Sequence, residues 1–371
     1  MRTFFLFVTI LVVTLVSCSS YEEPVFGKSE QQSSNKFLSN SEACIIASKA
    51  FADFGFEPQS RTARTAFASL YRPSFPSRSM EDTTFYVVNF SEGGFAIVSA
   101  DRSSNNPIIA ISDEGQFHED GDENVQFYMN YASDRFGPIR DSTKTIVQKL
   151  HVDTVITYHD RFMPTLWSQL DPYNRYCPIL PNGEKAAAGC VPVAMGQTMA
   201  FHRRPTSING YNLDWEQILC SKFLNKTTSE GVEGGAHLLH ELGKMLNVTY
   251  SEYGTSAYMP DAVDVFKELG YPDAEYGSDL MKCIETLKLH GPVPVRGYKP
   301  GERSGHAWVA DAAKILLLKT AFSLSPDVTE YYLHMNWGAA GGNNGYFLVN
   351  PEYNNNDIHG HNYLDYITGV K

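Results

Sequence analysis

Cys190 lies in a segment whose sequence could activate a thiol. In residues 188–192 a glycine directly precedes the cysteine, and a proline follows two residues later. Proline is tolerated in the first turn of a helix because its missing N–H would be unpaired there anyway. We therefore expect Cys190 to start a helix, where the dipole and free backbone N–H groups favour the reactive thiolate. These five residues alone also fit a buried structural cysteine.

Three other segments supply candidate partners for this thiol. His306 begins an alternating apolar strand, and its imidazole could accept the thiol proton and later deliver one to a leaving amine. Asn336 ends another strand, and its amide oxygen could hold the His306 ring in the required tautomer while Trp337 shields that hydrogen bond from water. Upstream, the amide of Gln169 could donate to an oxyanion alongside the backbone N–H of Cys190.

The chain order of these residues, Gln, Cys at a helix start, His on a strand and then Asn-Trp-Gly, is typical of papain-type peptidases. More narrowly, the sequence resembles the streptopain-like cysteine peptidases over about residues 165–350. The matching residues are Trp167-Ser168-Gln169, Pro172-Tyr173-Asn174, Gly189-Cys190-Val191, Ala194-Met195, Gln197, Met199, His202, Tyr211-Asn212, Trp215, Tyr253-Gly254, Gly305-His306-Ala307, Asp311 and His334-Met335-Asn336-Trp337-Gly338. The resemblance implies a papain-like catalytic domain with Cys190 as nucleophile and His306 as general base and acid.

Members of this family are made as inactive precursors, so the resemblance also implies a zymogen. It assigns residues 41–140 to an inhibitory prodomain, an intramolecular partner of the enzyme, and residues 141–152 to a processing linker. It further implies protein or peptide substrates with a bulky apolar side chain at the second subsite. Gly305, Ser256 and Trp337 would contact them, and neither a cofactor nor a metal is implied.

Two regions depart from the family pattern. A second tryptophan usually follows Asn-Trp-Gly, whereas residues 339–342 here are Ala-Ala-Gly-Gly, which alters the walls of the leaving-group side. We expect the glycine-rich residues 341–345 to form a mobile loop beside the cleft. Residues 311–313 replace a usual glycine corner, and residues 314–329 read as a longer connection than in the family. Neither change removes a catalytic group.

The elements that must position these residues form two blocks. The first is a small α+β module with a helix over residues 41–54 capped by Ser41, and a flexible loop over 59–82. Short strands at 85–90, 94–99 and 107–111 and a closing helix at 124–135 complete this first block.

The second block, residues 153–371, follows a polar region at 141–160. It opens with a loop at 166–183, then has helices at 190–202, 235–246 and 262–269, and ends with strands at 292–296, 306–310, 331–335 and 346–349. Helices first and sheet last predict an α+β fold.

The N-terminus predicts export. Residues 4–16 are almost continuously apolar after a positive charge, too short a run to span a bilayer comfortably and typical of a signal peptide. The small residue before Cys18 resembles a bacterial lipoprotein signal, in which that cysteine is lipidated; a plain secretory signal is the alternative. We expect a signal peptide at 1–17 and a tether at 18–40. The protein would then reach the membrane only through its lipid, or be secreted from the cell.

Composition narrows the function further. The formal net charge of −12 opposes binding to a phosphate backbone, and no basic stripe is present, so nucleic acid is excluded as a partner. The six cysteines form no recognisable disulfide framework, and an odd number remains once Cys18 is set aside. At least one thiol is therefore unpaired, which in an exported protein is a signal of reactivity.

Three other functions fit parts of this sequence less well than a peptidase does. Transglutaminase-like proteins also use Cys and His, but typically place an aspartate after the histidine, whereas this chain has Asn336-Trp337. A catalytically impaired surface binding or adhesion protein on the same scaffold has only the missing tryptophan in its favour. The run His237 to Glu241 has a spacing unlike that of zinc peptidases. It reads as an amphipathic helix with two partly exposed histidines.

Overall fold

The computed structural model describes residues 37–56, 66–71, 85–102, 104, 107–120, 123–136, 151–158, 163–299, 301, 305–320, 323–324, 326, 328–349 and 363–371. All of them belong to one compact unit, residues 36–371. The expected signal peptide, Cys18 and most of the expected tether lie outside the described residues. Among the residues that are described, no helix is long and apolar enough to span a membrane.

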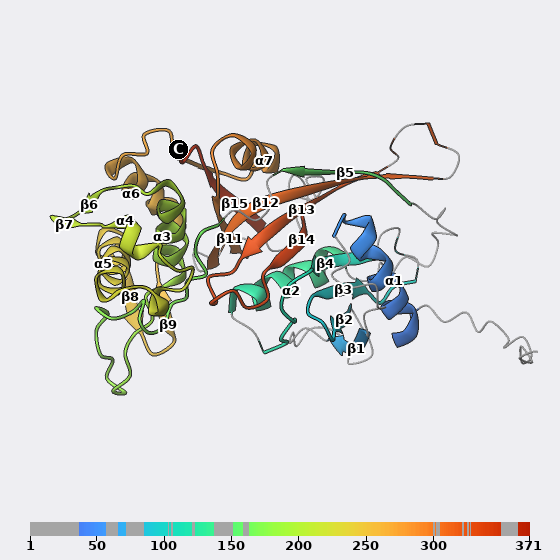
Figure 1. The fold of residues 1–371 in the computed structure, drawn as a ribbon, viewed down its shortest axis with the longest axis horizontal. Helices are drawn as coiled ribbons and strands as arrows, with labels where there is room; N and C mark the ends of the chain where they lie inside the picture. Colours follow the sequence, from blue (N-terminus) through green and yellow to red (C-terminus); the bar gives the residue numbers. More distant parts are fainter. Residues whose placement is uncertain are drawn as a thin grey trace, which may run out of the picture. The chain divides into compact units, whose positions relative to one another are not determined.

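Within the described residues the chain forms seven α-helices, two short 3-10 helices (Leu224–Lys226 and Met259–Asp261) and fifteen strands. Figure 1 shows how they are arranged. The helices are α1 (Asn40–Asp53), α2 (Glu123–Phe136), α3 (Cys190–His202), α4 (Trp215–Ile218), α5 (Ser229–Met245), α6 (Ala262–Glu268) and α7 (Leu280–Leu289). The strands are β1 (Ala66–Tyr71), β2 (Phe85–Phe90), β3 (Phe95–Ser99), β4 (Ile108–Ser112), β5 (His151–Tyr158), β6 (Ser207–Ile208), β7 (Tyr211–Asn212), β8 (Thr249–Ser251), β9 (Gly254–Ser256), β10 (Glu275–Gly277), β11 (Val293–Tyr298), β12 (Gly305–Lys319), β13 (Val328–Asn336), β14 (Gly345–Val349) and β15 (Tyr363–Thr368).

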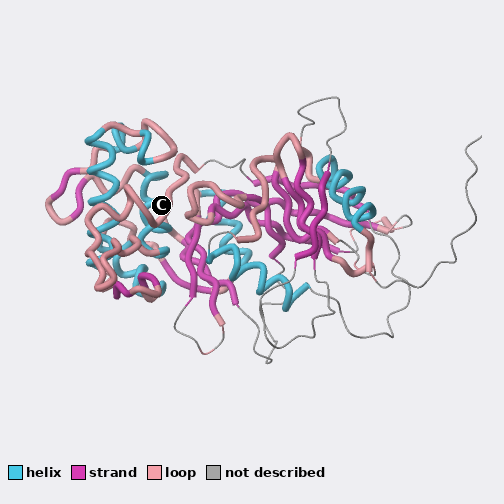
Figure 2. Tube along the Cα trace, turned by 90° about the horizontal axis from the view of Figure 1, so that it is seen from below, coloured by secondary structure: helices cyan, strands magenta, loops and turns pink. Residues whose placement is uncertain are grey.

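One antiparallel sheet runs through both predicted blocks. Its strand order is β1-β2-β3-β4-β14-β13-β12-β11-β15-β10, with β5 added to β12. The two blocks join where β4 pairs with β14, with Ile111 opposite Tyr346 and Ala110 opposite Phe347. The first block is therefore α+β as predicted, but its strands extend the sheet of the second block rather than forming a sheet of their own. In both views the helices α3 to α6 gather at one end of this sheet (Figures 1 and 2).

The start of the first block differs from the prediction in two details. Helix α1 is capped by Ser39 rather than Ser41, because Ser39 and Glu42 form a reciprocal capping box. The expected loop at residues 59–82 contains strand β1, whose six residues all pair with β2. Serine- and proline-rich flanks conceal this strand in the sequence.

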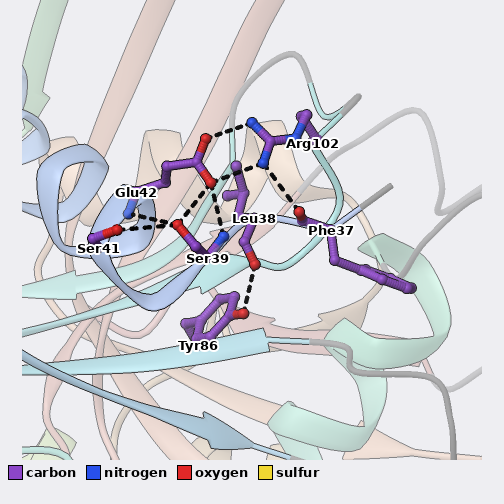
Figure 3. Close-up of polar contacts among 7 residues, drawn as sticks. All are labelled: Phe37, Leu38, Ser39, Ser41, Glu42, Tyr86 and Arg102. Carbon is purple, nitrogen blue, oxygen red and sulfur yellow. Dashed lines mark hydrogen bonds and ion pairs between the residues drawn. The ribbon is translucent and has the colours of Figure 1, made fainter. Parts of the chain in front are cut away.

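A polar cluster fastens the beginning of the described chain to β2 and to the residues that follow β3 (Figure 3). Arg102 bonds the Glu42 carboxylate at 2.8 Å and the carbonyl of Phe37 at 3.1 Å. Tyr86 donates its hydroxyl to the carbonyl of Leu38 at 2.6 Å. The hydrogen bond from Arg102 is the main reason why the pKa of Glu42 falls to about 2. The folded first block thus begins a few residues before position 41.

The helices of the two blocks cover different parts of the sheet. Helix α1 packs on β1 to β4, α3 packs on β11 and β12, and α7 packs on β5, β11, β12 and β15. Helix α2 was expected to close the first block, but it packs on β11 and β12 of the second. Its aromatic residues, predicted to share one face, therefore serve as a bridge between the blocks.

The second block keeps its predicted order but has more regular structure than expected. Residues 314–329 are not a long connection, because β12 continues to Lys319 and β13 begins at Val328. Strand β5 forms from the polar region at 141–160 by pairing with the far half of β12. The expected corner at residues 311–313 is a β-bulge within β12. Helix α7 and strands β10 and β15 were missed.

Helix α5 begins at Ser229, six residues before the prediction, in a glycine-rich stretch that disfavours helix on propensity alone. Tight packing explains these glycines. A Cβ on Gly235 would lie 2.5 Å from Leu224 Cδ1, and one on Gly231 would lie 2.3 Å from the carbonyl oxygen of Gln217. Tertiary contact therefore overrides the local preference.

Candidate active site

Cys190 is the first residue of α3, as predicted. Gly189 caps the helix with φ 96°, a left-handed conformation that glycine adopts without strain, and Cys190 is partly buried. A Cβ on Gly189 would lie only 3.0 Å from the Cγ2 atom of Thr255. The thirteen-residue helix directs its N-terminal dipole at the sulfur, which favours the thiolate.

Two loops attach to the residues just before this cysteine. The N–H of Ala188 donates to the carbonyl of Gln169 at 2.8 Å, which holds the Gln169 loop against the start of α3. The hydroxyl of Thr255 donates to the carbonyl of Ala187 at 2.7 Å and holds the β8–β9 hairpin, which ends in the exposed Ser256. Gln169 and Ser256, predicted as oxyanion and substrate contacts, are thus both carried by loops fastened beside Cys190.

Gly305 and His306 open strand β12 and pair with β11. Gly305 lies opposite Tyr298, and His306 lies opposite Gly297. Gly305 is exposed, and a Cβ there would lie 2.4 Å from the Gly297 carbonyl oxygen, so only glycine fits. The backbone at Gly305 is therefore bare and open for a close approach.

The side chain of His306 faces the prodomain helix α2. Its ring centroid lies 5.8 Å from that of Phe127, and its Nδ1 atom lies 3.8 Å from Glu123 Oε2. The side chain is 29% exposed, and burial lowers its pKa while the Glu123 carboxylate opposes that change. Strand alternation explains this orientation, because Trp308 shares the α2 core whereas Ala307 joins the α3 core.

Asn336 does not hold His306 in this structure, contrary to the prediction. Its Nδ2 donates to the Thr165 carbonyl at 2.9 Å, and its Oδ1 accepts from Gln197 Nε2 and from the backbone N–H two residues on, both at 3.3 Å. Asn336 pairs with Val309, whose side chain lies on the α3 face. The asparagine and the histidine therefore project from opposite faces of the sheet.

Trp337 is likewise not a substrate contact here, since it is 0% exposed. Its ring packs at 5.9 Å from Tyr128 of α2 and at 5.0 Å from Trp308. Its Nε1 donates to the Asn343 carbonyl at 2.9 Å, and its own carbonyl accepts from Asn124 Nδ2 at 2.6 Å. Helix α2 covers the indole, which is part of the core between the blocks.

The turn after Trp337, predicted as a mobile loop, is fastened to the first block. Asn343 Oδ1 accepts from the backbone N–H of His118 at 2.7 Å, and Asn343 Nδ2 donates to the backbone carbonyl of His118 at 3.1 Å. Asn344 Oδ1 accepts from the Trp337 N–H at 3.2 Å. Two of these three bonds join the turn to the first block, so the turn is fastened in part by the prodomain.

The other chemistry-bearing groups behave as structural residues. The His237 ring stacks between those of Tyr176 and Tyr211, with both centroid distances 4.1 Å. No cluster of three His, Cys, Asp or Glu side chains in the described part of the chain could hold a metal ion. Burial raises the pKa of the Cys177 and Cys283 thiols, which makes them poor nucleophiles.

Sequence reasoning missed the prodomain residues that touch the site. Glu123 and Asn124 start α2, yet nothing local links them to His306 or Trp337. The one signal in the sequence was the aromatic face of this helix, which contains Phe127 and Tyr128. Such a face predicts packing on an apolar surface, but it does not indicate which segment supplies that surface.

Comparison with known proteins agrees with this architecture. Residues 167–347 match the Peptidase C10 family, and residues 35–135 match the Spi protease inhibitor family. The chain is a streptopain-like cysteine peptidase. Its prodomain is inhibitor-like and precedes a papain-like domain, so the chain is a cysteine protease zymogen.

Individual relatives of this peptidase are distant but extensive. Streptopain of Streptococcus pyogenes is 25% identical over 369 residues, covering 82% of this chain and 88% of that protein. The thiol protease/hemagglutinin PrtT of Porphyromonas gingivalis is 22% identical and covers 74% of this chain but 35% of that longer protein. The solved structure of a prointerpain A fragment from Prevotella intermedia matches 82% of this chain and 99% of its own, with a TM-score of 0.58 and 19% identity.

Proposed function

We propose that this chain is the precursor of an exported endopeptidase in which Cys190 and His306 form a thiolate–imidazolium pair. The observation that carries the proposal is the position of Cys190 at the N-terminus of α3, between the loops of Gln169 and Ser256. The prodomain helix that contacts His306 adds the means of keeping the precursor inactive.

The chemistry follows from these positions. The Cys190 thiolate attacks the substrate carbonyl, and the oxyanion accepts hydrogen bonds from the Cys190 backbone N–H and the Gln169 amide. Protonated His306 then donates a proton to the departing amine, which leaves an acyl-enzyme thioester. Neutral His306 next takes a proton from water as the water attacks the thioester, and the acid product leaves with Cys190 restored. Substrate backbone binds along Gly305 and Ser256.

Inactivity of the precursor is attributed to the orientation of His306. The ring lies on the α2 face, where Phe127 and Glu123 hold it, whereas α3 and Cys190 lie on the other face. We propose that removal of the prodomain releases the ring to turn toward the thiolate. We propose that cleavage occurs between α2 and β5, a position supported by the pairing of β5 with β12 from His151 onward.

The N-terminal signal supports export, with Cys18 as the lipidated end and the following polar segment as its tether. Lipidation would hold the zymogen at the cell envelope, and cleavage of the prodomain would release the peptidase domain from its anchor. A plain secretory signal would give the same enzyme without the anchored stage.

Labelling with an epoxide thiol inhibitor tests this function. Matured protein should be modified on Cys190 and lose activity in proportion, and the Cys190→Ala variant should take no label. Cys220→Ser is the matched control, since Cys220 is the exposed thiol of the described residues and should be dispensable. Matured protein that is labelled elsewhere or not at all would favour a binding protein on a peptidase scaffold.

A further inference from the structure

The turn that follows Trp337 reaches the helix that carries Cys190. A Cβ on Gly338 would lie 3.2 Å from the Cγ1 atom of Val193. Val193 follows Cys190 by three residues in α3, and residues three apart lie on the same face of a helix. The turn therefore lies against the face of α3 that carries Cys190.

The same turn is joined to the segment that carries Gln169. The backbone N–H of Ala340 donates to the carbonyl of Trp167 at 3.0 Å, and a Cβ on Gly341 would lie 3.2 Å from Leu166 Cδ1. Ala340 has φ 53°, a left-handed conformation that is uncommon for residues other than glycine, and this hydrogen bond helps to hold it. These contacts lie wholly within the peptidase domain, so they do not require the prodomain.

These positions assign the turn to the leaving-group side of the site. The residues before the scissile bond are proposed to dock along Gly305 and Ser256, and the hairpin that ends in Ser256 is fastened to the chain just before Cys190. That docking leaves the turn at residues 338–342, together with the Gln169 segment, to border the residues after the scissile bond.

Prodomain helix α2 covers this turn in the precursor. Asn124 in the first turn of α2 donates to the Trp337 carbonyl at 2.6 Å, and neighbouring Glu123 lies 3.8 Å from His306. Ala339 is partly buried against the apolar core to which α2 contributes. The start of α2 thus contacts both the turn and the proposed base, and removal of the prodomain would open this place to substrate.

The surface opened in this way is uncharged and has short side chains. Residues 338–342 are Gly-Ala-Ala-Gly-Gly, so none of them carries a side chain larger than a methyl group. Residues 163–170 and 337–342 contain no charged side chain. Leu170, which follows Gln169, exposes 63% of its surface. Such a surface has room for a large substrate side chain and gains most from apolar atoms that leave water.

We propose that Ala339 is a specificity-determining residue whose small size selects substrates with a bulky apolar residue directly after the scissile bond. The inference rests on the peptidase function proposed above. It concerns the leaving-group side, and it leaves the apolar preference implied at the second subsite unchanged.

Matched peptides test this selection on protein matured from the full-length precursor. Four peptides share all residues before the scissile bond, with Leu as the second residue before it, and carry Phe, Leu, Gly or Asp directly after it. All four form the same acyl-enzyme, so differences in kcat/KM arise before the amine departs. We expect kcat/KM for the Phe peptide to exceed that for the Gly peptide by about tenfold, and that for the Asp peptide to be the lowest.

Variants at position 339 test whether this residue sets the preference. Ala339→Trp should lower the Phe to Gly ratio by about tenfold, because the larger side chain occupies the same space, and Ala339→Val should lower it by less. Met281→Trp is the matched control. It introduces the same side chain at an exposed position of α7, a helix whose buried residues belong to the core of Trp308 and not to that of α3. Its Phe to Gly ratio should equal that of the wild type.

A wild-type enzyme that cleaves the Gly or Asp peptide as fast as the Phe peptide would overturn the proposal. An unchanged ratio in Ala339→Trp would overturn it as well. The wild-type series decides the matter even where a variant does not fold. Failure of the peptidase function itself would give a different result, in which none of the four peptides is cleaved and the epoxide does not label Cys190.

Discussion

The two faces of strand β12 are built in different ways. On one face Ala307 and Val309 pack with α3 into a core that belongs wholly to the peptidase domain. On the other face Trp308 packs with Trp337 and with Phe127, so the prodomain supplies part of the core. Removal of the prodomain would leave the first face intact and expose the second.

This difference separates the proposed nucleophile, Cys190, from the proposed base, His306. Cys190 depends on α3 and its neighbouring loops, all within the peptidase domain, and is assembled in the precursor. His306 lies on the face completed by α2, and its environment changes when α2 leaves. In the mechanism that we propose, the prodomain keeps the precursor inactive by holding His306 alone, without distorting the surroundings of Cys190.

Loss of the nucleophile should have the largest effect. The purified wild-type precursor should shorten by roughly 14 kDa under reducing conditions at neutral pH, a size set by the prodomain and tether. Cys190→Ala should stay full length when incubated alone and lose activity by on the order of 10⁴-fold or more. Gel electrophoresis and peptide hydrolysis measure both results. Equal maturation of this variant, with contaminating protease excluded, would refute self-processing.

Truncation of Phe127 should selectively weaken the packing of prodomain helix α2 on strand β12. Phe127→Ala removes a buried ring that contacts His306 and Trp308, at a cost to prodomain docking of about 3 kcal/mol. The precursor should therefore mature faster, by on the order of tenfold, as followed by the half-time of processing. Ile45→Ala on α1, where the side chain is 70% exposed, is the control and should mature at the wild-type rate. If Phe127→Ala matured at the wild-type rate, the contact between Phe127 and His306 would not be what keeps the precursor inactive.

A smaller effect is expected at the turn that follows Trp337. Asn343→Ala removes both hydrogen bonds to the His118 backbone, a loss of about 1–2 kcal/mol in docking. In the Cys190→Ala background, the prodomain should become more sensitive to an added protease. Asn225→Ala, in an exposed turn of the peptidase domain, should leave that sensitivity unchanged. A wild-type digestion rate for Asn343→Ala would mean that these bonds do not hold the prodomain.

The smallest effect concerns pH. Burial lowers the pKa of His306 below its ordinary value of 6.5. The buried neutral imidazole therefore contributes fully to the stability of the precursor above pH 6.5, and this contribution is lost as the pH falls through the lowered pKa. The melting temperature of Cys190→Ala precursor should therefore fall below pH 6.5 more than that of Cys190→Ala/His306→Asn. Glu123→Gln should enlarge the loss, because the carboxylate that opposes the pKa shift is gone. Identical pH curves with and without His306 would contradict this assignment.

Local signals explain which elements could be predicted. Helix α3 has the predicted bounds because a glycine turn and an early proline mark its start and the sequence Arg-Arg-Pro follows its end. Strands β2, β3 and β4 have apolar runs between glycine and asparagine turns. Strand β5 and the far half of β12 were missed, because no residue of β5 is fully buried and the two segments, far apart in the sequence, form strands by pairing with each other. Helix propensity likewise misplaced the glycine-rich start of α5.

The sequence by itself predicted a thiol at a helix start and an imidazole on a strand, and its resemblance to a known family implied an inhibitory block ahead of them. These depend on residue types and on short-range geometry, which neighbouring residues dictate. Tertiary structure alone decided that His306 faces α2, that Asn336 faces away from it and that Trp337 is covered. The face of a strand follows from pairing register and from the bulge between Ala310 and Ala312, and the helix that covers it comes from a distant segment. Such long-range choices leave no mark near the residues that they control.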